Sequence, residues 1–369
     1  MYFKEVFLYN FRNYEEEHVS FDEKINIFLG ENAQGKTNLL ESLFVMGLGK
    51  SFRTGKDTEM IGFEKEFARI KTVICDPDAA DQEKEIEIVY RPEGKIIRVQ
   101  GIKLERSMEL LEEVYIVVFS PEDLGIIKEG PDKRRRFLDR ELCQLKPVYY
   151  NTLGQYKRVL KQRNALLKNQ RRENVLLGTY DEALVEHGLR LTREREAFVT
   201  RLQKISRQIH HTISNGRETL EIGYESDFLK EKKSEETEKR DILALLEKNR
   251  ERDYRKGYTF LGPHRDDLSI SVNGTDIRQF GSQGQQRTAA LSMKLAEISL
   301  IRQETGKQAI LLLDDVLSEL DEGRQTFLIG AMKEVQVFIT ATNIEEEMLR
   351  RLPSGRVFDV CGGRVKRLT

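Results

Sequence analysis

Residues 1 to about 110 carry the hydrophobic spacing of β-strands. Apolar and polar residues alternate with a period of two, which is the spacing of a strand with one buried face. This pattern occurs at residues 4–8, 68–74, 85–90 and 96–99. The segment Pro92-Glu93-Gly94 lies between the last two and predicts a tight turn, so these two strands should form a hairpin. We expect this part of the chain to fold into a mostly antiparallel sheet.

Between residues 145 and 257 the spacing becomes helical. Apolar residues recur three and four positions apart, which places them on one face of an α-helix. Two such series are Leu153, Tyr156, Leu160 and Leu167, and Phe198, Leu202, Ile205 and Ile209. The stretch is rich in Lys, Arg, Glu and Leu, and it is predicted to form antiparallel helices, a short arm rather than a long coiled coil.

Strand signals return after residue 257. Asn273-Gly274 lies between the alternating segments 268–272 and 275–277 and favours a two-residue hairpin turn. A helix is expected at about residues 285 to 303. The continuous apolar runs at 309–313 and 335–339 are typical of strands that are buried on both faces, as in a parallel sheet.

These changes of pattern divide the chain into two domains. Residues 1–144 and 258–369 are predicted to form one α/β head with mixed sheets, and residues 145–257 a helical arm inserted into it. A length of 369 residues agrees with about two domains.

Residues 30–37 match the phosphate-binding loop G-x-x-x-x-G-K-[ST]. The apolar residues 25–29 before the loop are predicted to form a buried strand, and residues 38–44 after it a helix, which is the context that this loop requires. Backbone N–H groups of such a loop, together with the helix N-terminus, attract phosphate oxygens. The predicted nucleotide-binding residues are Gly30, Glu31, Asn32, Ala33, Gln34, Gly35, Lys36 and Thr37. Lys36 should reach the β- and γ-phosphates and Thr37 should ligate Mg²⁺. We expect the helix that carries this loop to lie inside the antiparallel sheet.

A second part of this site is predicted at Asp314 and Asp315, which end the apolar run at 309–313. Ligands of α/β proteins bind at the carboxyl ends of strands. Asp314 is expected to hold Mg²⁺, directly or through water, and Asp315 to orient the attacking water as a general base. Two acids at a strand end are common by themselves, but their presence together with a phosphate loop elsewhere in the chain favours ATP hydrolysis.

Ser282, Gln283 and Gly284 precede the helix expected at about 285 to 303. A small hydroxyl next to the first amides of a helix makes an anion site. Because one nucleotide needs only one phosphate loop, this second anion site would contact ATP bound to another copy of the chain. An ordinary helix N-cap at Ser282 is the alternative, and the local sequence leaves both open.

The overall charge limits the partners that the chain attracts. The 61 basic and 62 acidic residues leave a net charge of −1, so contact with nucleic acid would depend on local basic patches.

The three cysteines, Cys75, Cys143 and Cys361, have no disulfide or metal-site spacing. No secretory signal and no membrane-spanning stretch is found in the sequence, so we expect a cytoplasmic protein without membrane contact. His210 and His211 are predicted to be a surface pair and no metal site is expected.

One local basic patch lies at the start of the predicted arm. Between residues 144 and 172 there are eight cations and no acid: Lys146, Lys157, Arg158, Lys161, Arg163, Lys168, Arg171 and Arg172. They could form a stripe that contacts DNA phosphates or a solvated helix face. The predicted DNA contacts are Lys157, Arg158, Lys161, Arg163, Arg171 and Arg172. Since no base-reading motif is present, such binding should be largely independent of sequence.

Taken together, the motifs resemble those of ABC-type ATPases. The phosphate loop, the Ser-x-Gly-Gln signature, the acidic strand and a D-loop-like segment, residues 318–321, follow in the order of that class. The long stretch between the loop and the signature is similar to the SMC-like branch, where a helical insertion splits the ATPase head. Within that branch the chain resembles the RecF family over its whole length. The residues that carry the resemblance are 10–14, 30–41, 50–54, 119–124, 262–268 and 282–288.

The resemblance implies an ATP-dependent mediator of recombination and repair. RecF-like proteins bind ATP and Mg²⁺, dimerise head to head, bind duplex DNA near single-strand gaps and help RecR and RecO to load RecA. On the same ground Arg12 and Asn38 join the predicted nucleotide-binding residues, and Ser282–Gly284 would contact the γ-phosphate held by the partner copy.

Three positions depart from the pattern of ABC-type ATPases. Asp315 stands where many of them have Glu, Ser120 stands at the Gln-loop position, and residues 340–342 replace a switch His. We therefore expect slow, DNA-stimulated hydrolysis that acts as a switch rather than a motor. The alternatives are an SMC-like clamp that acts mainly through protein partners and, with less support, a small-molecule kinase. The cluster at residues 264–267 could be a packing network or a functional contact.

Overall fold

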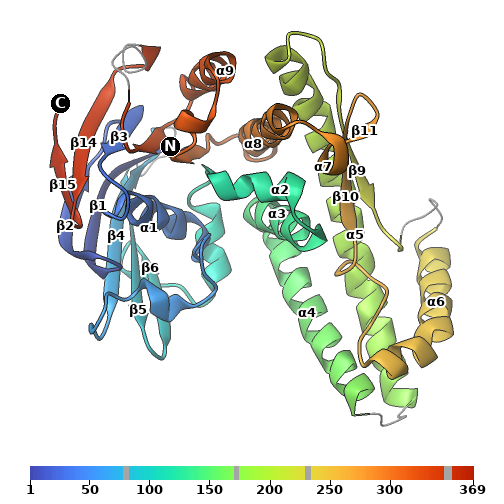
Figure 1. Ribbon diagram of the computed structural model, residues 1–369. Helices are drawn as coiled ribbons and strands as arrows, with labels where there is room; N and C mark the ends of the chain where they lie inside the picture. Colours follow the sequence, from blue (N-terminus) through green and yellow to red (C-terminus); the bar gives the residue numbers. More distant parts are fainter. Residues whose placement is uncertain (78–82, 170–173, 229–233, 345–350) are drawn as a thin grey trace. The chain divides into compact units, whose positions relative to one another are not determined.

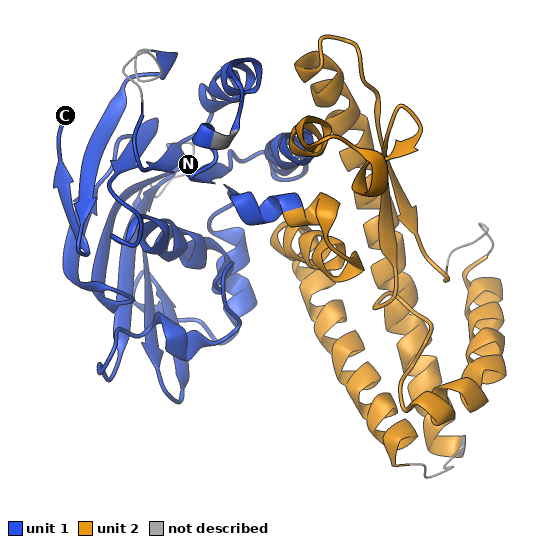
Figure 2. Cartoon of the chain, in the orientation of Figure 1, with its two compact units in different colours: residues 1–124, 290–369 blue, residues 125–289 orange. Residues whose placement is uncertain are grey.

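The computed structural model describes residues 1–77, 83–169, 174–228, 234–344 and 351–369 (Figure 1). The chain folds into two compact units, which Figure 2 shows in different colours. Unit 1 comprises residues 1–124 and 290–369, and unit 2 comprises residues 125–289. Both ends of the chain therefore build one unit, and the middle of the chain is inserted between them.

Unit 2 is larger than the arm expected at residues 145–257. Helix α3, Pro131–Leu145, belongs to unit 2, and its Arg134 makes a two-pronged ion pair with Asp267 on strand β10, Asp267–Val272. Strand β10 in turn pairs with β9, Leu220–Glu225. The segments on both sides of the arm are thus attached to it by contacts that residue spacing does not reveal, so the predicted boundaries at 144/145 and 257/258 differ from those of the structure.

One layer of unit 1 is an antiparallel sheet with the strand order β2-β1-β4-β5-β6-β7. Its strands are β1 (Tyr2–Phe11), β2 (Tyr14–Ser20), β4 (Ala68–Cys75), β5 (Glu83–Arg91), β6 (Gly94–Val99) and β7 (Ile102–Lys103). All four strands predicted from the alternating pattern lie in this sheet. The predicted hairpin is confirmed, since β5 and β6 pair up to Arg91 and Gly94.

The second sheet of unit 1 has the order β15-β14-β3-β13-β12-β8 and is parallel from β14 to β8. Its strands are β3 (Ile25–Leu29), β8 (Ile116–Phe119), β12 (Ile310–Asp314), β13 (Val337–Ala341), β14 (Gly355–Cys361) and β15 (Arg364–Arg367). The strand before the phosphate loop is β3, so the expectation that the loop belongs to the antiparallel sheet is wrong. The physical reason is that β3 is buried almost throughout, as a strand inside a parallel sheet must be.

Helix α1, Lys36–Leu48, joins the two sheets. It packs against strands of both and is buried on nearly all sides. Its Leu39 and Leu43 share a hydrophobic core with Ile70 of one sheet and Phe338 of the other. Among the described residues, the other helical elements that lie wholly in unit 1 are η1 (Asp57–Met60), η2 (Ser107–Glu112), η3 (Pro121–Leu124), η4 (Leu317–Glu319) and α9 (Glu322–Met332). The loop before α1 is therefore supported by a well-packed helix.

Unit 2 is mostly helical. Besides α3 it contains α2 (Gly125–Lys128), α4 (Pro147–Lys168), α5 (Asn174–Ile213), α6 (Glu235–Lys256) and α7 (Ile277–Phe280), while α8 (Gln283–Thr305) begins in unit 2 and continues in unit 1. Helices α4, α5 and α6 pack together as predicted for the arm (Figure 1). Strand β9 was not expected, and it forms a small sheet with β10 and β11, Thr275–Asp276. Within the described ranges, none of the helices is long and apolar enough to cross a lipid bilayer.

A buried ion cluster joins the three arm helices. Arg163 of α4 is completely buried and donates to Asp181 of α5 at 2.7 Å and to Asp253 of α6 at 2.7 Å. A further hydrogen bond of 2.8 Å reaches Thr259, and Arg250 also binds Asp181, at 3.0 Å. Because buried charges are costly unless they are paired, this cluster fixes how the helices meet.

The cluster at residues 264–267 also has a packing role within unit 2. His264 accepts a hydrogen bond from Tyr156 at Nδ1, at 2.6 Å, and donates from Nε2 to the carbonyl of Thr259, at 3.0 Å. Burial lowers the pKa of His264 to about 4, so its ring is neutral near pH 7. Asp266 accepts from Tyr224 and Asp267 binds Arg134. These contacts support the packing interpretation of the cluster.

The variant Arg163→Leu is expected to lower the free energy of unfolding by about 3–5 kcal/mol, because it removes the charge that pairs with two buried carboxylates. The matched control is Lys161→Leu, two residues away and exposed, which should change stability by about 0.5 kcal/mol or less. Urea unfolding followed by circular dichroism gives both values. Similar small losses for the two variants would contradict a structural role for the cluster.

Candidate functional site

The phosphate loop connects β3 to α1 and depends on glycine at both ends. Gly30 and Gly35 have φ values of 153° and 119°, which residues with a side chain rarely adopt. A Cβ atom at Gly30 would lie 2.3 Å from the carbonyl oxygen of Val360. The backbone can therefore follow this path only without a side chain at that position.

Lys36 lies across the loop. Its Nζ donates to the carbonyl oxygens of Gly30, at 2.5 Å, and Glu31, at 2.8 Å. Burial lowers the pKa of Lys36, while the nearby charges of Asp315 and Asp314 act in the opposite direction. The predicted phosphate-contacting cation is thus held beside the two predicted acids.

Thr37 and Asp314 are brought together by the parallel sheet. The Thr37 hydroxyl donates to Oδ1 of Asp314 at 3.0 Å, although the two residues are 277 positions apart. Thr340, at the end of the intervening strand β13, donates to the same oxygen at 2.7 Å. Burial raises the pKa of Asp314, and the hydrogen bonds from Thr340 and Thr37 oppose this. A hydroxyl and a buried carboxylate are oxygen ligands of the kind that Mg²⁺ prefers.

Asp315 follows in a strained conformation, with a φ of 55°. Its backbone N–H donates to the carbonyl and hydroxyl oxygens of Thr340, at 3.2 and 3.1 Å. Thr340 therefore positions both acids. Thr340 lies in the segment 340–342, which departs from the switch-His pattern of ABC-type ATPases. That departure marks the segment in the sequence but does not predict that Thr340 positions the two acids.

Arg12 and Asn38 lie beside the loop in a polar network. Arg12 binds both oxygens of Glu41 through Nε and Nη2, at 2.9 and 2.8 Å, and Ser51 and Arg53 also contact Glu41. Asn38 accepts from Arg53 at 2.7 Å. In this structure the Arg12 side chain thus supports helix α1, and its contact with nucleotide stays a prediction.

Several residues that were not predicted support the loop from outside. Asn13 donates to the carbonyl oxygen of Gln34 at 3.1 Å, and Tyr14 donates to that of Gly35 at 3.0 Å. From the turn between β14 and β15, the backbone N–H groups of Gly362 and Gly363 donate to Gln34 at 2.8 and 3.0 Å. Asn13 and Tyr14 belong to a segment that carries the family resemblance, whereas the glycine turn had no comparable signal.

The signature residues Ser282–Gly284 lie in unit 2, where Ser282 and Gln283 are exposed. The Ser282 hydroxyl oxygen accepts from the backbone N–H of Gln285 at 3.2 Å, and the Gln285 side chain accepts from the N–H of Ser282 at 3.0 Å. This reciprocal pair is a capping box. Ser282 thus acts as the N-cap of α8, and its contact with a second copy stays a prediction.

The predicted DNA contacts divide into three groups. Lys157, Arg158 and Lys161 are exposed on α4, and Lys157 lies 3.6 Å from Asp139. Arg163 is fully buried in the ion cluster, so its assignment as a DNA contact is wrong. Arg171 and Arg172 lie outside the described residues. Of the two adjacent histidines, His211 is exposed but His210 is fully buried against Glu218, so they are not a surface pair.

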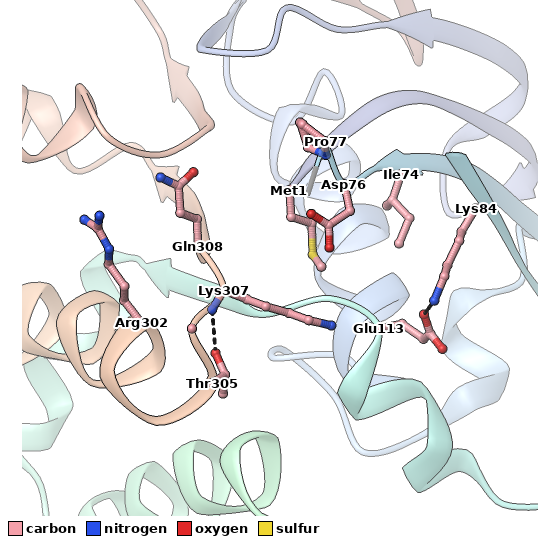
Figure 3. Close-up of a pocket in the computed structure, with 11 residues that line it drawn as sticks. Met1, Ile74, Asp76, Pro77, Lys84, Glu113, Arg302, Thr305, Lys307 and Gln308 are labelled. Atoms are coloured by element: carbon pink, nitrogen blue, oxygen red, sulfur yellow. Dashed lines mark hydrogen bonds and ion pairs between the residues drawn. The ribbon is translucent and has the colours of Figure 1, made fainter. Parts of the chain in front are cut away.

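A cavity of about 550 Å³ opens elsewhere in unit 1, at the end of β4 and the turn after α8 (Figure 3). Two cations at its wall are already paired, Lys84 with Glu113 at 2.9 Å and Arg302 with Glu334 at 2.7 Å. Among the described residues that line it there is no predicted site residue, so we do not assign the nucleotide to this cavity.

Comparison with known proteins identifies the family. The sequence profile of the RecF/RecN/SMC N-terminal domain matches residues 2–355. The DNA replication and repair protein RecF of Shouchella clausii (strain KSM-K16) is 44% identical over 98% of both chains. The protein of that name from Clostridium botulinum (strain Okra / Type B1) is 41% identical over the full length of both. The chain belongs to the RecF family.

Solved structures agree with this membership. The recombination mediator protein RecF of the RecFOR pathway, solved with ATP, is 38% identical, and the comparison covers 100% of this chain and 98% of that one with a TM-score of 0.91. An Smc head bound to the C-terminal winged-helix domain of ScpA is 14% identical, with a TM-score of 0.58 over 100% and 97% of the chains, and shows the shared fold. The predicted fold class, an α/β ATPase head of the SMC and RecF type, is confirmed.

The glycine turn beside the loop gives a test of loop support. A Cβ atom at Gly363 would lie 2.3 Å from the carbonyl oxygen of Asn13, whereas one at Gly362 would have no atom within 4 Å among the described residues. Both glycines have a left-handed backbone, with φ values of 73° and 55°, so alanine costs about 1 kcal/mol at either position. Gly363→Ala should cost about 1–3 kcal/mol more through steric overlap, and it should also weaken nucleotide binding.

Thermal unfolding and the binding of a fluorescent ATP analogue measure the two effects. If Gly362→Ala and Gly363→Ala behaved alike in both assays, the turn would not support the phosphate loop.

Proposed function

We propose that this chain is an ATP-dependent, DNA-binding mediator of recombination and repair. It dimerises when ATP is bound, binds duplex DNA near single-strand gaps and, in the cytoplasm, helps RecR and RecO to load RecA. The observation that carries the proposal is the hydrogen bond between Thr37 and Asp314 beside a phosphate loop. Membership of the RecF family supports the choice of pathway.

The nucleotide would occupy the loop from Gly30 to Asn38. Its phosphates would replace the carbonyl oxygens as partners of the Lys36 ammonium, which is already placed at the loop. Thr37 and Asp314 would hold Mg²⁺, which neutralises phosphate charge when it is bound. Asp315 would orient the attacking water. Because the side chain of Asp315 is one methylene shorter than that of Glu, we expect ATP hydrolysis to be slow. DNA would stimulate this hydrolysis, which would act as a timer for the nucleotide state.

The dimer would form through the signature residues. The Ser282 hydroxyl accepts one hydrogen bond from within its own loop and retains a proton that it can donate. Its exposure, and that of Gln283, leaves both side chains accessible to a second copy. A γ-phosphate held by the partner copy would accept this bond. ADP lacks the γ-phosphate, so the nucleotide state would set the dimer state.

DNA would be bound by the exposed cations of α4. Lys157, Arg158 and Lys161 fall within two turns of one helix, and Lys161 follows Lys157 by four positions and Arg158 by three. Such a row can follow a phosphate backbone without reading bases. RecR is the expected direct partner, with RecO and RecA as further partners in the same process.

Two substitutions separate nucleotide binding from dimerisation. Lys36→Arg should reduce hydrolysis by roughly 10²-fold or more and weaken the ATP-dependent dimer, because the bulkier guanidinium replaces a positioned ammonium. Ser282→Arg should leave ATP binding by the monomer unchanged but abolish dimerisation. Equilibrium dialysis and analytical ultracentrifugation measure these two properties. Loss of ATP binding in Ser282→Arg would rule out the contact across the dimer, and normal turnover in Lys36→Arg would rule out the loop assignment.

DNA binding should depend on salt in proportion to the number of phosphate contacts. Each of Arg158→Ala and Lys161→Ala should reduce the slope of log affinity against log salt by about 1, equally for unrelated duplexes. Lys103→Ala, an exposed cation on β7 of unit 1, is the matched control and should leave the slope unchanged. Fluorescence anisotropy with a labelled duplex measures the slopes. Unchanged slopes in both α4 variants would contradict DNA contact by this helix.

A further inference from the structure

We propose that Glu218 is a positioning residue for the signature residues Ser282–Gly284, which it holds to the end of the long arm helix α5. The inference deepens the proposed function and rests on it, because the geometry of these residues matters only if they contact a second copy. Every residue in the argument lies in unit 2.

The contact starts at Gln285, in the first turn of α8, whose side-chain amide is used at both ends. Its oxygen accepts from the backbone N–H of Ser282 at 3.0 Å, and its nitrogen donates to Oε1 of Glu218 at 3.0 Å. The first hydrogen bond completes the capping box, and the second connects Gln285 to Glu218, outside the α8 cap. An amide held on both sides cannot rotate without breaking one of the two bonds, so Glu218 fixes the orientation on which the capping box depends.

Glu218 is itself well anchored. Its Oε2 lies 3.1 Å from Nε2 of His210, which is fully buried near the end of α5. Its backbone N–H donates to the hydroxyl oxygen of Ser214 at 3.2 Å. The side chain is 23% exposed, so its charge is partly shielded from water and its hydrogen bonds are stronger than exposed ones. The order Ser282, Gln285, Glu218, His210 is therefore a continuous series of contacts from an exposed loop to a buried ring.

This series explains two features that the proposed function alone does not use. A buried histidine at the end of a 40-residue helix has no part in nucleotide binding, yet it contacts the carboxylate that holds the signature. Ser282 and Gln283 are exposed and have glycine on both sides, at Gly281 and Gly284, so their local sequence does little to restrict the backbone. Binding groups act well only when they are held near the productive geometry, and here Glu218 provides that restraint.

A purely structural role for Glu218 predicts a loss of stability and nothing more, so the test uses a reversal of the hydrogen bond. Gln285→Glu places two carboxylates opposite each other while its own oxygen still accepts from Ser282. Adding Glu218→Gln restores one amide and one carboxylate with the direction of the bond reversed. The control is Glu221→Gln, an exposed carboxylate three positions away on β9.

Two measurements are made on the full chain. Hydrogen exchange of the nucleotide-free protein reports whether the amides of Ser282 and Gln285 are protected, and sedimentation with ATP reports dimerisation. We expect Gln285→Glu to exchange at these amides at least about tenfold faster and to weaken the dimer by about tenfold or more, since one charged hydrogen bond is lost. The double variant should recover most of both effects, and Glu221→Gln should match the wild type.

The outcomes separate this inference from the proposed function. If the double variant is as defective as Gln285→Glu, or if Gln285→Glu behaves like the wild type, Glu218 does not position the signature. If exchange follows the expected pattern but the wild type stays monomeric with ATP, the positioning is upheld and the ATP-dependent dimer is contradicted.

Discussion

The hydrogen bond between Thr37 and Asp314 is the contact on which the site depends. It joins residues 277 positions apart, and it can form because β3 and β12 lie in one parallel sheet on either side of β13. The carboxyl ends of parallel strands meet at the same edge, so the phosphate loop, the acids and Thr340 converge there. A long insertion is compatible with this arrangement, since both ends of the chain contribute strands to the same sheet.

Local patterns in the sequence were sufficient to predict the phosphate loop, the acidic strand and both hairpins. Each of these is encoded by contiguous residues whose backbone requirements are strict, such as Gly30 and Gly35 at positive φ. Pairing between strands that are distant in the sequence cannot be predicted from such local patterns. Periodicity indicates which face of a strand is buried but not which strand lies next to it, so the sheet that contains β3 was assigned wrongly. For the same reason, local patterns do not predict the contact between the glycine turn at 362–363 and Gln34, which is far away in the sequence.

The buried charges of unit 2 show how composition can mislead. The run of cations along α4 predicts Arg163 to be part of a basic stripe, yet this residue occupies the helical position between Leu160 and Leu167 that the apolar series assigns to the buried face. Its partners Asp181 and Asp253 come from other helices, and no count of charges along α4 could reveal them. His210 is similar, since it lies eight positions after Leu202, on the same face of α5. A polar residue inside an apolar helical series is better read as a buried, paired group than as a surface one.

We propose that the nucleotide state sets the assembly state of this chain. The most direct test of this proposal is the solution mass by light scattering with ATP, with ADP and without nucleotide, each in the presence and absence of a duplex oligonucleotide. We expect the mass of two chains with ATP and the mass of one chain with ADP or without nucleotide. The ATP-bound dimer should also bind the duplex more tightly. The mass of a single chain under every condition would leave the phosphate loop as a nucleotide site but contradict the switch built on it.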